Sequence, residues 1–157
     1  MKLSDVVETI KTKAENIPFV QEVFMHPLGA DIVEMVDGKP TRTGTRITAY
    51  PALIFAPGTF DNQFSTTDSN HRTFNFNAWL VINAENIENV DIYERVLPNA
   101  VDGVLAEYDK GWDFGTVNGH RVWARMASGS FGITPEDNGR EVWCEMMLTV
   151  RADVDVV

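Results

Sequence analysis

Apolar residues recur at helical spacing over the first seventeen positions of the chain. They form one narrow stripe, with acidic and hydroxyl side chains on the opposite side, and Pro18 follows the last of them. This pattern predicts an amphipathic helix that ends before Pro18. The stripe consists of Leu3, Val6, Val7, Ile10, Ala14 and Ile17.

Strict alternation of apolar and polar positions replaces the helical spacing further along. Residues 72–83 place apolar side chains on one face and asparagine, tryptophan and valine on the other. The first face is therefore expected to be buried and the second to be partly exposed to solvent. Together with residues 59–66 they flank the turn-rich stretch 67–70, which predicts two long antiparallel strands. Residues 52–56 are predicted as a short buried strand, because Pro51 and Pro57 bracket it.

Helical spacing returns over residues 90–109, although Pro98 lies inside this range. The apolar positions keep the same phase on both sides of Pro98, which itself projects onto the polar side. We therefore expect one helix bent at Pro98. The alternative is a break, with Pro98 starting a second helix at its first position.

The last third of the chain predicts two further strands, residues 120–127 and 140–154. Between them, residues 127–139 are rich in Gly and Ser and include Phe131, which indicates a long loop. We expect this loop to be a docking element, with Phe131 as an anchor for a partner. A slack loop that persists without a function is the alternative.

These elements predict an α+β fold with a mainly antiparallel sheet, two long hairpins, and two amphipathic helices packed on one face. Residues 1–157 are expected to form a single domain. Residues 19–50 are a possible embellishment, with a short strand in residues 19–25, a turn at 36–40, and a loop or frayed strand at 41–46.

The net charge of −10 makes binding of nucleic acid or of an anionic membrane unfavourable. No stretch is long and apolar enough to predict a membrane span or a signal peptide. The acidic excess gathers between residues 85 and 113, on an expected exposed surface.

The sequence predicts no catalytic, cofactor-binding or metal site. His26, His71 and His120 lie far apart beside turn residues, and Cys144 has no second cysteine with which to pair. We expect Cys144 to be a buried, free thiol in a strand. The clustered carboxylates at 135–141 and 107–113 are of the kind used by magnesium sites and glycosidases. Solvent-exposed acidic surfaces also account for such clusters.

Two tryptophans, Trp79 and Trp143, fall on the wetter faces of their strands. Such side chains suit a sheet face that another subunit covers. Alternatively, the helices cover that face, or the tryptophans fill the edge of the sheet.

The order of these elements resembles that of the tail terminator, or tail completion, proteins of tailed bacteriophages. Residues 71–116 are similar to the hairpin strand and long helix of that family, residues 121–154 to its closing hairpin, and "YPALIF" at 50–55 to its first core strand. The likeness is one of strand and helix patterns rather than chemical signatures, and it covers about two-thirds of the chain.

The resemblance implies a structural, non-enzymatic virion protein located at the junction of tail and neck and assembled in the host cytoplasm. It implies a closed ring of copies, usually a hexamer, which ends polymerisation of the tail tube and docks to a neck stopper or connector protein. DNA would pass through the ring without specific binding. Partner contacts are then expected at Ser130, Phe131, Ile133, Trp79 and Trp143, and a negative lumen at Glu85, Glu88, Asp91, Asp102 and Asp109.

Two alternatives stay open. The first is another head–tail joining protein, such as a stopper or connector, or a component of the tail tube. The second is a small magnesium-dependent hydrolase that uses some of the many carboxylates.

Overall fold

The computed structural model describes residues 2–64, 69–110, 113–117, 120–136 and 139–155. The chain begins with α1 (Leu3–Glu15), followed by β1 (Glu22–Phe24), β2 (Asp31–Val36) and β3 (Lys39–Gly44). Two long strands follow, β4 (Ala52–Phe64) and β5 (Ser69–Asn83). A helical segment then consists of α2 (Asn89–Asp91), η1 (Ile92–Val96) and α3 (Leu97–Lys110), and the chain finishes with β6 (Asp113–Val117), β7 (His120–Glu136) and β8 (Gly139–Asp155). The fold class is therefore α+β, as expected.

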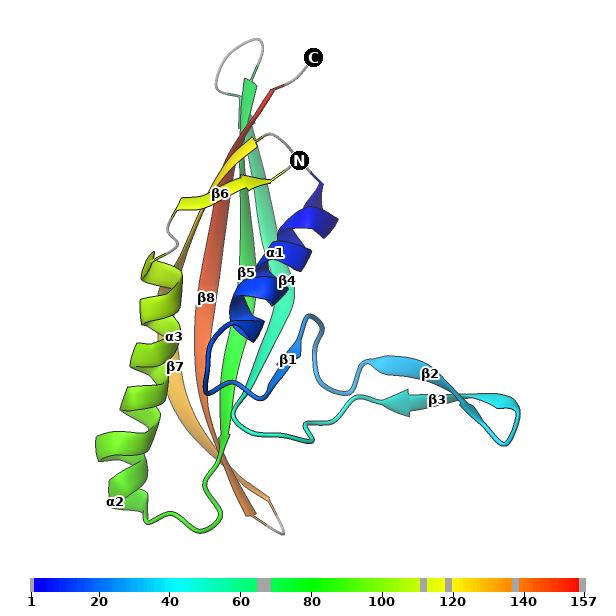
Figure 1. Ribbon diagram of the computed structural model, residues 1–157, viewed down its shortest axis with the longest axis vertical. Coiled ribbons are helices and arrows are strands. Elements are labelled where there is room, and N and C mark those ends of the chain that lie inside the picture. Colours follow the sequence, from blue (N-terminus) through cyan, green and yellow to red (C-terminus); the bar gives the residue numbers. More distant parts are fainter. Residues whose placement is uncertain (1, 65–68, 111–112, 118–119, 137–138, 156–157) are drawn as a thin grey trace.

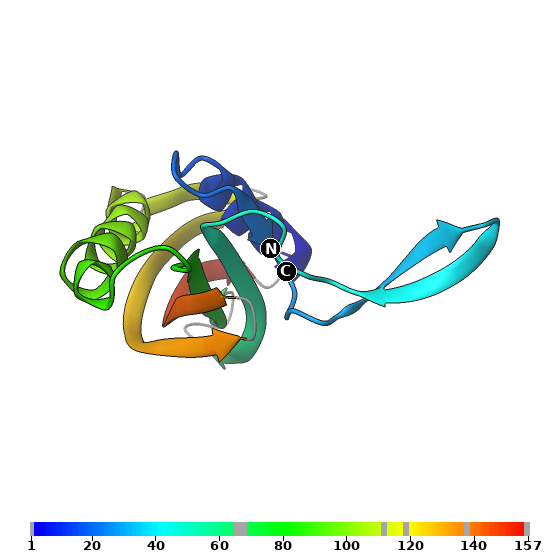
Figure 2. The same cartoon turned by 90° about the horizontal axis from the view of Figure 1, so that it is seen from below.

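The described strands form a six-stranded sheet in the order β1-β4-β5-β8-β7-β6 and a separate two-stranded sheet of β2 and β3. The large sheet is mixed, because β1 runs parallel to β4 while its other neighbouring strands are antiparallel. It curls along its length, and the β2–β3 pair extends away from it (Figures 1 and 2). The turns at 65–68 and 137–138 lie outside the described residues, so the two predicted hairpins stay a prediction.

Two expectations about the strands were wrong. Residues 52–56 are not a separate strand, because β4 continues through Pro57 with a register shift between Pro57 and Thr59. At this irregularity the missing N–H of proline is tolerated. The long loop at 127–139 is also absent: β7 reaches Glu136 and β8 starts at Gly139, with a register shift between Met126 and Gly129. Gly129 therefore stands at a bulge rather than in a loop.

The helical segment is continuous from Asn89 to Lys110, so the expectation of one helix across Pro98 is confirmed, while the bend at Pro98 stays a prediction. Five residues just before Pro98, Ile92–Val96, form a π-helical turn. A wider turn at this place fits the chemistry of proline, which lacks an N–H and crowds the carbonyl of the preceding turn.

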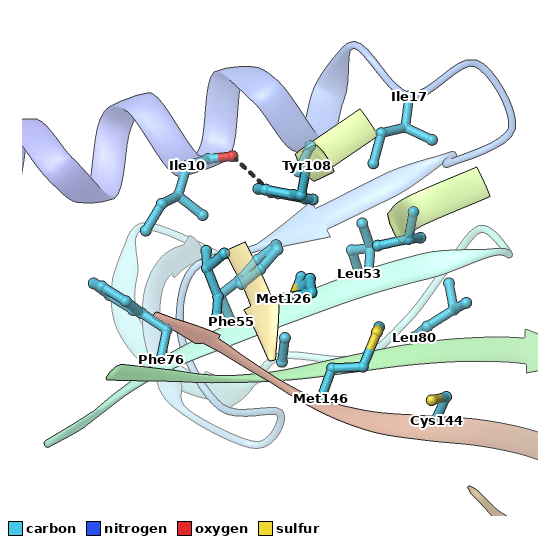
Figure 3. Packing of buried hydrophobic residues seen from close by; sticks show 14 of the residues in the cluster. Ile10, Ile17, Leu53, Phe55, Phe76, Leu80, Tyr108, Met126, Cys144 and Met146 are labelled. Atoms are coloured by element: carbon cyan, nitrogen blue, oxygen red, sulfur yellow. Dashed lines mark hydrogen bonds between the residues drawn. The ribbon is translucent and has the colours of Figure 1, made fainter. Parts of the chain in front are cut away.

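The core lies between both helices and one face of the sheet (Figure 3). From α1 come Val6, Ile10 and Ala14, and from β5 the alternating residues Phe76, Ala78, Leu80 and Ile82, as the sequence pattern predicted. Cys144 is buried and free, as expected, and burial raises the pKa of its thiol.

Tyr108 joins both helices to the sheet. Its hydroxyl donates to the carbonyl oxygen of Ile10 over 3.4 Å, and its ring lies 6.3 Å from that of Phe55, centre to centre (Figure 3). The side chain is fully buried. Burial, with a smaller contribution from the neighbouring Glu107, raises the pKa of the Tyr108 hydroxyl.

Candidate functional site: an apolar arm and an apolar hollow

The segment 31–44 forms an arm, β2 and β3, that projects from the body of the molecule (Figures 1 and 2). Its tip is a two-residue turn in which Asp37 has φ 51° and Gly38 has φ 73°. Positive φ at both positions is typical of the type I′ turn, which aspartate–glycine favours because its twist matches that of the strands. The turn predicted at residues 36–40 is thereby confirmed.

The two faces of the arm differ in polarity. Val33 and Met35 share one face, where they pair across the strands with Arg42 and Pro40. Their side chains are 66% and 70% exposed. The other face carries Ile32, Glu34 and Val36, so a carboxylate interrupts its apolar surface. The Val33 and Met35 face, called the arm face below, carries the two most exposed apolar side chains of β2.

Glu22 fixes the segment through which the chain returns from the arm to the body. Its Oε2 accepts hydrogen bonds from the backbone N–H of Thr48 at 2.8 Å and of Ala49 at 3.0 Å. Thr45 and the segment 29–30 also exchange backbone hydrogen bonds, each of 3.1 Å. The base of the arm is therefore attached to the sheet, while its strands pair with no other strand in the described part of the chain.

A hollow on the face of the large sheet opposite the core, called the outer hollow below, has a volume of about 290 Å³. Trp79 and Trp143 line it together, so the structure brings these two predicted interface residues to one place. At its rim the Tyr50 hydroxyl donates to Glu141 Oε1 over 2.5 Å. The full lining is Pro27, Leu28, Ile54, Trp79, Val81, Glu141 and Trp143.

Further along the same face, the side chains are polar and form hydrogen bonds with one another. Asn75 donates through Nδ2 to Thr59 Oγ1 over 2.9 Å, and its Oδ1 accepts from Thr149 Oγ1 over 3.0 Å. These contacts join β4, β5 and β8. This part of the outer face is therefore polar, in contrast to the outer hollow.

The other three predicted interface residues lie on β7. Ser130 is exposed and lines a second hollow with Asn77, Glu145 and Met147. In the ladder with β8, Phe131 pairs with Cys144 and Ile133 pairs with Val142. The side chains of Phe131 and Ile133 lie outside the described part of the structure. Phe131 is thus not on a loop tip, and its role in docking stays a prediction.

The predicted acidic residues are all exposed. Glu85 and Glu88 lie between β5 and α2, and Asp102 and Asp109 lie on α3. Asp91 forms an ion pair with Arg95, with Oδ2 and an Arg95 guanidinium nitrogen 3.3 Å apart. This contact partly offsets the negative charge of Asp91.

The sequence analysis missed the most exposed apolar side chains. Besides the arm face, these are Phe60 and Phe64 on β4, which are 76% and 89% exposed. Their spacing of four in a strand puts them on the same face, which is a signal that sequence reasoning could have used. β4 pairs with β1 only through residues 52–54, so among the described strands this edge of residues 55–64 has no partner.

No known family model matches the sequence, and no curated protein matches it significantly. In the described ranges, no group of three or more histidine, cysteine, aspartate or glutamate side chains is arranged to hold a metal ion. Nor does any helix in these ranges have the length and apolar character needed to cross a membrane.

Proposed function

We propose that this chain is a structural subunit of a tailed-phage virion that assembles with copies of itself into a closed ring, usually of six. The ring caps the head-proximal end of the tail tube, ends its polymerisation and docks the tail to a neck stopper or connector protein. The observation that carries the proposal is the pair of exposed apolar surfaces, arm face and outer hollow, on one chain. Apolar surfaces of this kind mark contacts between proteins.

The proposal includes joined or overlapped sheet edges between neighbours, with the two long hairpins as the framework. The open edge of β4 at residues 55–64 supports this, since an unpaired edge can pair with another chain. Pro57 lies in this edge and removes one backbone donor, so pairing would concern the residues after it.

The proposed ring would have a net negative lumen formed by the exposed acidic residues Glu85, Glu88, Asp91, Asp102 and Asp109. DNA passing through such a channel is repelled by the wall and does not adhere to it. The role is structural and needs no catalytic group or cofactor.

The test is electron microscopy of the purified protein together with its mass in solution. Closed rings with a mass of six copies of 17.6 kDa are expected. Because some assemblies need a template, the same measurement is made with tail tubes present, where the rings should lie at one end of each tube.

A chain that stays monomeric at high concentration and also with tubes present would contradict the proposal. Rings that leave tube length uncontrolled but join neck components would favour a stopper or connector instead. Magnesium-dependent turnover of a phosphate ester or a glycoside would favour a hydrolase.

A further inference from the structure

We propose that the arm face of one copy docks in the outer hollow of a second copy of this chain. This inference rests on the proposed function for the identity of the partner, and it names the contact through which the copies associate. It assigns Val33 and Met35 to one side of the contact, and Trp79 and Trp143 to the other.

The arm needs a partner to bury its apolar residues. A two-stranded sheet by itself is marginally stable in water, because it has no second layer to cover its apolar face. Val33 and Met35 stand on the same face with most of their surface in solvent. The contacts of Glu22 attach the base of the arm to the body, and the arm extends from there, so its exposed face can meet another molecule.

The outer hollow offers a surface of the matching kind. Its volume of about 290 Å³ exceeds the roughly 150 Å³ of a protein cavity that accommodates benzene, so it has room for two aliphatic side chains. The walls are mainly apolar, with two tryptophans, and aromatic residues are enriched where proteins meet. Valine and methionine side chains can pack against these rings, and methionine adapts to an irregular surface.

The charges favour a copy of this chain as the occupant. The arm, residues 31–44, contains three carboxylates and two cations, and Arg46 just after it brings residues 31–46 to a net charge of zero, so the other residues carry the whole net charge of −10. Lys39 and Arg42 lie on β3, the returning strand of the arm, and Arg46 follows this strand in the chain. The neighbouring copy has the carboxylate of Glu141 at the rim of its outer hollow. This carboxylate would attract the cations of the docked arm.

The positions of the two surfaces set the kind of association. Pro27 and Leu28, which line the outer hollow, lead directly into the arm of the same chain. The arm then extends away from the body (Figures 1 and 2). Each copy therefore has one arm to give and one hollow to receive, so copies can associate head to tail. Such contacts form a ring if the rotation between copies closes.

Four chains test the contact by sedimentation velocity and mass photometry: the wild type, an arm variant, a hollow variant and a control. The arm variant is Val33→Glu with Met35→Glu, and the hollow variant is Trp79→Glu. The control, Ile32→Glu with Val36→Glu, adds the same two charges to the opposite face of the same strand. We expect wild type and control to assemble alike, and association of the other two to be weakened at least tenfold.

Mixing the arm variant with the hollow variant gives a sharper result. The intact arm of the hollow variant meets the intact hollow of the arm variant, so each pair forms one contact. No second contact is available for growth, so the mixture should contain dimers and no larger species. Circular dichroism and thermal melting check that each variant is folded. If Trp79→Glu does not fold, Leu28→Glu replaces it, because Leu28 lines the same hollow and is exposed.

An arm variant that assembles like the wild type would overturn this inference and leave the proposed ring intact. Open chains of copies that depend on the arm and the outer hollow would support it while contradicting the closed ring. A wild type that is monomeric at every concentration, or a mixture of variants without dimers, would also overturn it.

Discussion

At the scale of single residues, Tyr108 shows how one side chain couples the elements of the fold. It lies on α3, bonds to a carbonyl of α1 and packs beside Phe55 of β4. The Ile10 carbonyl belongs to a helix, so it keeps a helical partner without the tyrosine. The hydroxyl therefore contributes little to stability in the neutral form, while the buried ring contributes much.

Tyr108→Phe should make the protein less sensitive to alkaline pH. Because the folded pKa of Tyr108 is raised above its ordinary 10.0, the folded chain keeps a proton that the unfolded chain releases. Stability is unaffected below about pH 10 and falls above it, by about 1.4 kcal/mol per pH unit for this one group. Urea unfolding between pH 8 and 11 should show a shallower decline for Tyr108→Phe than for wild type. Tyr93→Phe, at a half-exposed position, is the control, and an equal effect from it would contradict the assignment.

At the scale of elements, the close approach between β7 and β8 explains why residue 129 is a glycine. The sequence pattern alone had placed this glycine in a loop. A Cβ on Gly129 would lie 2.4 Å from the carbonyl oxygen of Glu145. This oxygen belongs to the backbone of the neighbouring strand and cannot rotate away. Gly129 stands at the end of the register shift that begins at Met126, so the bulge brings the two backbones together there.

Gly129→Ala should therefore destabilise the fold by about 1–3 kcal/mol, the usual range for an overpacked site. Chemical denaturation monitored by tryptophan fluorescence measures this change. The control is Gly44→Ala, since a Cβ at Gly44 would meet its nearest atoms at 3.6 Å, an ordinary contact distance. If both variants have the same stability, the strands at Gly129 are further apart than the structure indicates.

At the scale of the whole molecule, charge opposes the association that the apolar surfaces favour. Each copy carries a net charge of −10, so two copies repel one another before they touch. Salt shortens the range of this repulsion, from about 30 Å at 0.01 M to about 3 Å at 1 M. Burial of apolar residues does not depend on that screening, so the contact itself persists.

Association should accordingly tighten as the NaCl concentration rises from 0.01 M to 1 M, on the order of tenfold, or about 1.4 kcal/mol. Equilibrium sedimentation gives the dissociation constants. The variant Glu85→Gln, Glu88→Gln and Asp102→Asn changes the net charge from −10 to −7 and should reduce this dependence. Association that weakens with salt would instead mean that ion pairs across the interface dominate.

Elements with a clear local pattern could be predicted from the sequence. The spacing of Val6, Ile10 and Ala14 sets the buried side of α1, and the alternation at Phe76, Ala78 and Leu80 sets that of β5. The unbroken apolar phase across Pro98 gave one continuous helix. The presence of Trp79 and Trp143 in one hollow could be predicted only in part. The alternation of apolar and polar residues showed on which face of its strand each tryptophan lies, but their proximity depends on β5 and β8 being neighbours in the sheet.

What the sequence by itself determined is the periodic part of this protein: the two helices, the buried faces of β5 and β8, and the aspartate–glycine turn. These depend on neighbours within a few residues, whose propensities act locally. Only the tertiary structure decided the parallel placement of β1 beside β4, the strand at 129–136, and the arm whose apolar face stays uncovered. These features depend on pairing between residues far apart in the chain. Every backbone N–H and C=O group can form the same hydrogen bonds, so the local sequence does not specify which distant strand a segment pairs with.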